Sequence, residues 1–137
     1  MREVWLVHAI LHFLVPIIVI FNYIIFFKEI KIENIIAILI GSFIPDIDHV
    51  AYYKFAPKNF LKFLKFNITS DRIRRGFLIF HNLPFLAFWS ILTPITALYS
   101  INLFLFFLSF LLHLILDYLD DKFVLGYTYH WRRGKGI

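Results

Sequence analysis

Long apolar segments alternate with short polar ones along the chain, and this pattern predicts a helical membrane protein. The first apolar run, residues 5–27, contains no Asp, Glu, Lys or Arg, and its length can cross about 30 Å of hydrocarbon. A shorter run covers residues 32–47, and two further runs cover residues 77–100 and 101–119. We therefore expect an all-α, multi-pass membrane protein in which residues 1–137 form one domain with about four transmembrane helices.

The most hydrophilic part of the chain, residues 51–76, separates the second apolar run from the third. Phe and Leu alternate with lysines over residues 54–66, and three arginines follow. Aromatic and basic side chains in this arrangement favour an amphipathic helix that lies in the membrane interface, between the second and third transmembrane helices. The alternative is a flexible basic loop.

Prolines and one asparagine predict where helices begin, bend or end. Pro45 lacks a backbone donor and disfavours helical backbone at the residue before it, so we expect the second helix to stop here, with Ile44 outside it. Asn82 is expected to cap the third helix, with Pro84 in its first turn. Pro94 should kink the middle of that helix.

Composition supports the membrane interpretation and limits the chemistry. The chain is 61% hydrophobic, whereas a soluble domain is about half apolar. It contains no cysteine, so any metal must be held by nitrogen and oxygen ligands. The net charge is +5, but in a membrane protein basic residues chiefly set orientation, and we expect no nucleic-acid partner.

The basic residues predict which side of the membrane each end faces. With four spans, the N-terminus, residues 51–76 and the C-terminal tail fall on one side, and together they carry all the lysines and arginines except Lys28 and Lys31. Basic residues accumulate on the cytoplasmic side of a membrane. We therefore expect a multi-pass protein of the inner membrane with both termini in the cytoplasm.

Histidines and aspartates gather in one layer of this predicted topology. His8 and His12 begin the first span, Asp46, Asp48 and His49 end the second, His81 begins the third, and His113 and Asp117 end the fourth, all on the cytoplasmic side. The members of the pairs 8/12 and 113/117 are four residues apart, so each pair shares one helix face. Ionisable side chains at membrane depth are costly and usually mark functional sites.

A divalent metal ion would explain this set of residues. The first-choice ligands are Asp46, Asp48, His81, His113 and Asp117, completed by either His8 or His12. Zinc is favoured, with manganese or iron as alternatives. Taken singly, each residue has a structural alternative, such as a helix cap, an interfacial side chain or a polar contact between helices.

The stretch G-S-F-I-P-D-I-D-H, residues 41–49, resembles the G-S-x-x-P-D-x-D-H motif of the LexA-binding, inner-membrane-associated hydrolase family. An N-terminal histidine, Arg75-Gly76 followed by His81, and His113 with Asp117 resemble further elements of that family in order. The central element departs from the family pattern, because His81 comes five residues after Gly76 and Asn82 replaces a serine. The family is similar to the zinc-dependent phospholipase C group.

The resemblance implies a membrane-bound, metal-dependent hydrolase that acts on a phosphate ester at the cytoplasmic face. His49 would be a ligand or the general base. Arg75 would clamp phosphate, because its guanidinium matches phosphate oxygens, or would contact lipid headgroups. Membrane lipids are the expected partners, and a phospholipid or another phosphorylated molecule is the expected substrate. The alternative is a non-enzymatic metal-binding scaffold or an ion carrier.

Overall fold

The computed structural model describes the backbone of residues 2–47 and 80–123 and, within them, the side chains of all residues except 2–9, 120 and 121. All regular secondary structure in these two ranges is helical, which confirms the all-α prediction. The helices are α1 (Arg2–Phe27), α2 (Ile32–Phe43), the 3₁₀ helix η1 (Ile44–Asp46), α6 (Leu83–Thr96) and α7 (Ile101–Phe123). The predicted interfacial segment, residues 51–76, lies outside the described residues.

Within residues 2–47 and 80–123, two helices are long and apolar enough to cross a membrane. Their apolar windows are Ile10–Phe27 in α1 and Ile101–Leu119 in α7. The expected spans at residues 5–27 and 101–119 therefore coincide with long helices, each of which extends a few residues further at its polar end. The apolar helices α2 and α6 are shorter, at 12 and 14 residues.

Helix α6 begins as predicted but is shorter than predicted. The Asn82 side chain accepts a hydrogen bond of 2.9 Å from the Phe85 N–H, and Pro84 lies in the first turn. The helix expected over residues 77–100 therefore starts only at Leu83, because the cap fixes extended backbone at Asn82. It ends at Thr96, so the prediction of a kink at Pro94 in mid-helix is wrong, and this proline lies in the last turn.

Pro45 ends α2, but it does so without breaking the helical path. Helix α2 stops at Phe43 as expected, and the chain tightens into the 3₁₀ helix η1. Ile44 lies outside α2 as expected, but it keeps right-handed helical angles, φ −58° and ψ −38°, so the expectation of non-helical backbone before the proline is wrong. A 3₁₀ turn replaces the hydrogen bond that proline cannot donate, since the Ile47 N–H bonds the Ile44 carbonyl. The turn places Asp46 one residue after the proline.

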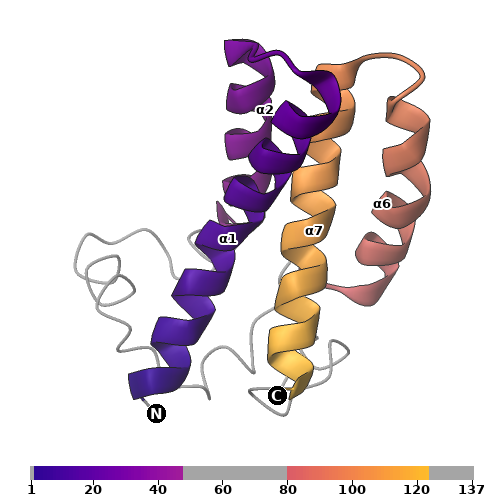
Figure 1. Cartoon of the computed structure of the whole chain (residues 1–137). Helices are drawn as coiled ribbons and strands as arrows, with labels where there is room; N and C mark the ends of the chain where they lie inside the picture. Colours follow the sequence, from indigo (N-terminus) through magenta and orange to yellow (C-terminus); the bar gives the residue numbers. More distant parts are fainter. Residues whose placement is uncertain (1, 48–79, 124–137) are drawn as a thin grey trace.

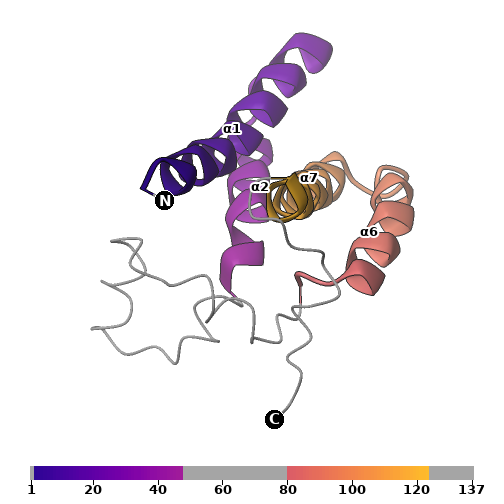
Figure 2. The same cartoon turned by 90° about the horizontal axis from the view of Figure 1, so that it is seen from below.

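Helix α7 is the centre of the bundle. It packs against α1, α2 and α6, while α1 also packs against α2. Seen along α7, α2 lies on one side and α6 on the other, with α1 on the same side as α2 (Figure 2). The start of α1 and the end of α7 lie at the same end of the bundle, and the α1–α2 and α6–α7 turns lie at the opposite end (Figure 1).

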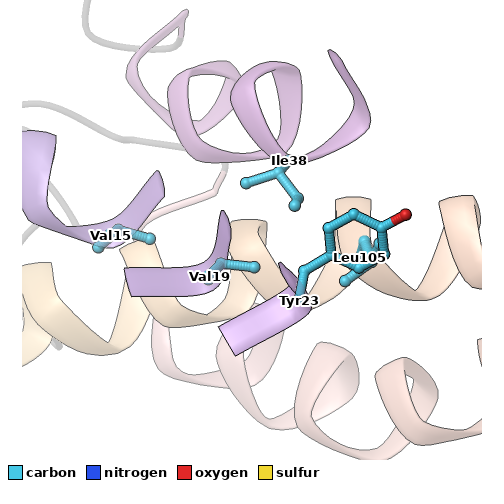
Figure 3. Close-up of a cluster of buried hydrophobic side chains, with 5 residues drawn as sticks. All are labelled: Val15, Val19, Tyr23, Ile38 and Leu105. Carbon is cyan, nitrogen blue, oxygen red and sulfur yellow. The ribbon is translucent and has the colours of Figure 1, made fainter. Parts of the chain in front are cut away.

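The core is apolar in the half of the bundle away from the predicted ligands. Val15, Val19 and Tyr23 of α1 repeat every four residues and meet Ile38 of α2 and Leu105 of α7 (Figure 3). The outward faces of the helices carry large exposed apolar side chains. Such faces suit hydrocarbon rather than water.

Gly41 brings α2 unusually close to α7. A Cβ atom added at this position would collide with the carbonyl oxygen of Phe106. Only glycine permits this approach, in the manner of small residues at membrane helix interfaces. Because α2 and α7 run in the same direction, the contact also brings the next turn, which carries Asp46, beside His113.

Candidate metal centre

Five of the predicted ligands come from four segments and meet at one end of the bundle. They are His12 on α1, Asp46 on η1, His81 directly before the α6 cap, and His113 and Asp117 on α7. Each position follows from a local feature of the sequence. The proline turn presents Asp46, the asparagine cap fixes the backbone beside His81, and four-residue spacing stacks His113 over Asp117.

Asp117 is the hub of the cluster. Its Oδ1 lies 2.9 Å from Nε2 of His12, and its Oδ2 lies 2.5 Å from Nε2 of His81 and 3.3 Å from Nε2 of His113. Only 1% of the Asp117 side chain is exposed. One buried carboxylate therefore contacts three imidazoles from three segments of the chain.

Asp46 closes the cluster from the α2 side. Its Oδ1 lies 3.5 Å from Nε2 of His113, and its Oδ2 lies 4.0 Å from Nδ1 of His12. The rings of His12 and His113 are in edge contact, with centroids 4.4 Å apart. In contrast to the other four side chains, that of Asp46 is partly open, with 32% of its surface exposed.

Several buried polar atoms in this cluster form no hydrogen bond of regular geometry. Within the described part of the chain, Nδ1 of His113 is buried without a hydrogen-bond partner, while Nε2 of His113 and Oδ1 of Asp117 have only the imidazole–carboxylate contacts given above, at 3.5 Å or less. An unpaired buried polar atom costs about 1–3 kcal/mol, and a buried charge costs more. Imidazole nitrogens and carboxylate oxygens that converge in this way are the atom types with which proteins hold divalent cations.

The geometry defines two overlapping groups of candidate ligands. His12, Asp46 and His113 form one, and His81, His113 and Asp117 form the other; within each, the ligand atoms lie within 4.8 Å of one another. Imidazole nitrogen and carboxylate oxygen suit zinc and also accept manganese or iron. The cluster is thus chemically able to hold a divalent metal.

The structure leaves four predicted site residues undetermined. His8 lies on α1, one turn before His12, but its side chain is outside the described set. Asp48, His49 and Arg75 also lie outside the described residues. Their expected roles as ligand, base and phosphate clamp therefore remain predictions.

Sequence reasoning missed the residues that position the site. Gly41 was considered only as part of a motif, whereas the structure uses it to seat α2 on α7. A small-residue pair, Gly41-Ser42, inside an apolar run was the available signal, since small residues mark close helix contacts in membranes.

Comparison with known proteins places the chain in one family. No curated protein and no solved structure matches the sequence. A family profile described as YdjM inner membrane protein matches residues 7–126, and this range includes all four α helices in part or whole and the five clustered residues. The match agrees with the expected inner-membrane location and with the two helices that can cross a membrane. The chain therefore belongs to the YdjM inner membrane protein family.

Proposed function

We propose that this protein is a membrane-bound, metal-dependent hydrolase that cleaves a phosphate ester at the cytoplasmic face of the inner membrane. The observation that carries the proposal is the meeting of three imidazoles and two carboxylates from four segments of the chain, with all but Asp46 buried. A polar contact between helices needs fewer ionisable groups than these five. The resemblance of residues 41–49 to a metal-dependent hydrolase motif supports the same assignment.

His12, Asp46, His81, His113 and Asp117 would hold the ion, which is zinc in the favoured case. A bound divalent ion polarises a phosphoryl oxygen and lowers the pKa of a bound water to about 7. Hydrolysis forms a bond from the water oxygen to phosphorus and breaks the ester P–O bond. One water proton passes to a base, for which His49 is the candidate, and the leaving alkoxide takes up a proton.

The protein residues divide this work by their burial. Asp117 contacts three histidines and is enclosed, so it orients the imidazoles and balances the ionic charge. Asp46 is the partly open ligand, so substrate would approach on its side. Arg75 remains the candidate for clamping the phosphate.

The alternative function is a metal-binding scaffold or an ion carrier. A carrier needs polar groups that continue through the bilayer. Thr93, Thr96 and Ser109, which lie deeper in the bundle, donate instead to carbonyls of their own helices. This observation favours a localised metal centre over an ion carrier. A metal-binding scaffold is then the main alternative to the hydrolase.

The proposal is tested first by metal content and then by activity. Protein purified without chelator should contain zinc, manganese or iron by elemental analysis. It should hydrolyse phosphomonoesters or phosphodiesters in a panel run with Zn, Mn and Mg, while His113→Ala and Asp46→Ala should abolish both activity and metal. Glu29→Gln, a carboxylate change at the opposite end of α1, is the matched control. Metal-loaded protein that cleaves nothing would favour the scaffold.

We further propose the multi-pass topology with both termini in the cytoplasm. Because the chain has no cysteine, single-cysteine variants report accessibility cleanly. A cysteine at Lys31 should react with a membrane-impermeant reagent from outside, and cysteines at Lys62 and Lys135 only from the cytoplasm. Labelling of Lys62 and Lys135 from opposite sides would contradict this arrangement.

A further inference from the structure

Among the residues that the structure describes, large apolar side chains border the open side of the candidate metal centre. Asp46 is the one partly exposed side chain among the five clustered residues. Its chain neighbour Ile47 is 56% exposed, and Phe43, one turn earlier, is 39% exposed. Each of these side chains belongs to the same proline turn or the end of α2.

A matching apolar residue comes from α1. Phe13 directly follows the clustered residue His12, is 61% exposed, and makes an edge contact with the ring of Phe43 at 5.8 Å. Helices α1 and α2 are packing neighbours on the same side of α7 (Figure 2). Phe13, Phe43 and Ile47, which we call the apolar rim, therefore border the centre where α1 meets η1.

The rim adjoins the two segments that are apolar enough to cross a membrane, so we place it at membrane depth. His12 falls within the apolar window of α1, and His113 and Asp117 fall within that of α7. Asp117 precedes Lys122, the first basic residue after it, by five residues, or roughly 7 Å along the helix. A partly exposed carboxylate at this depth, bordered by phenyl rings, is costly if it faces only hydrocarbon. A polar headgroup that reaches the centre while its chains stay in the bilayer removes that cost.

We propose that the substrate is a membrane-resident phosphate ester with acyl chains, which enters sideways from the bilayer between α1 and η1 and rests its hydrocarbon on the apolar rim. This inference rests on the proposed function. It specifies a lipid rather than a water-soluble phosphate as the source of the phosphate ester. The headgroup reaches Asp46, and the acyl chains contact Phe13, Phe43 and Ile47.

Matched substrates test the requirement for acyl chains. Dioleoyl phosphatidic acid and glycerol 3-phosphate share a phosphomonoester, and dioleoyl phosphatidylglycerol and glycerophosphoglycerol share a phosphodiester. With zinc-loaded protein, kcat/KM for the acylated member of the active pair should be at least about tenfold higher, since burial of two methylenes accounts for that factor. Equal rates for the two members would overturn lateral entry and leave the hydrolase proposal intact.

Rim variants test the location. Phe13→Ala and Phe43→Ala should raise KM for the lipid by about five- to tenfold, with kcat and the rate on the soluble member unchanged. Phe21→Ala is the matched control, because Phe21 is 63% exposed on the same helix and lies two turns from Phe13. If Phe21→Ala raises KM as much as Phe13→Ala does, the rim has no special role and the proposal fails.

A binding measurement separates this inference from hydrolysis. Phosphatidic acid with a photoreactive acyl chain, in phosphatidylcholine vesicles, should label Phe13 and Phe43 in a way that excess phosphatidic acid suppresses and diacylglycerol does not. Labelling of Phe21 and Phe88, which face bulk lipid, should resist both competitors. Competable labelling without any hydrolysis would support the rim and overturn the hydrolase. Labelling of the rim that no competitor suppresses would overturn the inference.

Discussion

The two ends of the bundle solve the problem of burying polar groups in different ways. At the ligand end, formed by η1, His81 and the last turns of α7, ionisable side chains converge around Asp117. At the hairpin end, formed by the α1–α2 and α6–α7 turns, the Asn34 side chain donates a hydrogen bond of 2.6 Å to the Tyr23 hydroxyl. At each end, polar side chains join neighbouring helices. Among the described residues, the hairpin end does this with a neutral amide and a hydroxyl, whereas the ligand end uses ionisable side chains.

The difference identifies which end of the bundle could hold an ion. The Tyr23–Asn34 bond is buried and links α1 to α2 without formal charge. Glu29 and Lys31, the charges nearby, are exposed and pair with each other at 2.8 Å; the Glu29 carboxylate raises the pKa of the Lys31 ammonium by accepting its hydrogen bond. The ligand end instead buries the Asp117 carboxylate among imidazoles, so a bound cation would stabilise this end of the bundle.

Metal removal should break the ligand end and produce the largest effect. At a free-ion concentration 1,000 times Kd, a bound ion stabilises a protein by about 4 kcal/mol. We expect a chelator to lower the apparent melting temperature in detergent by on the order of 10 °C, followed by circular dichroism. His113→Ala should melt at the same temperature with and without chelator. If neither chelator nor added zinc changes the melting temperature of the wild-type protein, the ligand end contains no ion.

Replacing one carboxylate at a time should lower zinc affinity at the ligand end and leave it unchanged at the hairpin end. Asp117→Asn should weaken zinc affinity by more than about a hundredfold, because this side chain contacts three histidines and is enclosed. Asp46→Asn should cost about tenfold, since Asp46 is partly exposed. Glu29→Gln at the hairpin end should change nothing. Isothermal titration with zinc provides the measurement, and an Asp46→Asn variant weaker than Asp117→Asn would reverse the assignment of the hub.

Gly41→Ala should disturb the ligand end through packing alone. The added methyl group meets the Phe106 carbonyl, and overpacking of this kind costs about 1–3 kcal/mol. Because Asp46 follows one turn later, zinc affinity should fall as well. Chemical denaturation in detergent measures the loss, with Ser90→Ala on the exposed face of α6 as the control. Unchanged stability in Gly41→Ala would mean that α2 and α7 separate there easily.

Tyr23→Phe should give the smallest effect. It deletes the hydroxyl that accepts from Asn34, and hydrogen bonds between membrane helices contribute about 0.6 kcal/mol on average. The free energy of unfolding should fall by about that amount, and zinc content should stay the same. A Tyr23→Phe variant that loses its metal would show that the two ends are coupled.

Patterns local in sequence predicted local structure well. The long uncharged runs became α1 and α7, and Asn82 capped α6 as expected, since span length and capping depend on a few neighbouring residues. Asp46, His81 and His113 could be expected to meet because the charge distribution along the chain implies which helix ends share a membrane face.

Features that depend on contacts between helices were not predictable. The helical angles at Ile44 reflect a 3₁₀ turn that accommodates Pro45, and propensity rules describe only the average residue before proline. The close approach of Gly41 to Phe106 requires the relative position of α2 and α7, which no single segment encodes. The contact of Asp117 with all three of His12, His81 and His113 likewise depends on how the helices pack, which the sequence pattern alone does not give.

The five clustered residues lie far apart along the chain, from His12 to Asp117, and this separation has a consequence for biosynthesis. About 70 residues separate Asp46 from Asp117, and ribosomes add about 5–20 residues per second. Helices α1 and α2 are therefore translated on the order of 10 s before the hub of the cluster exists. A chain truncated before α7 lacks two of the five ligands, including the carboxylate that joins the histidines. Capture of an ion by all five residues would therefore require that translation has passed α7.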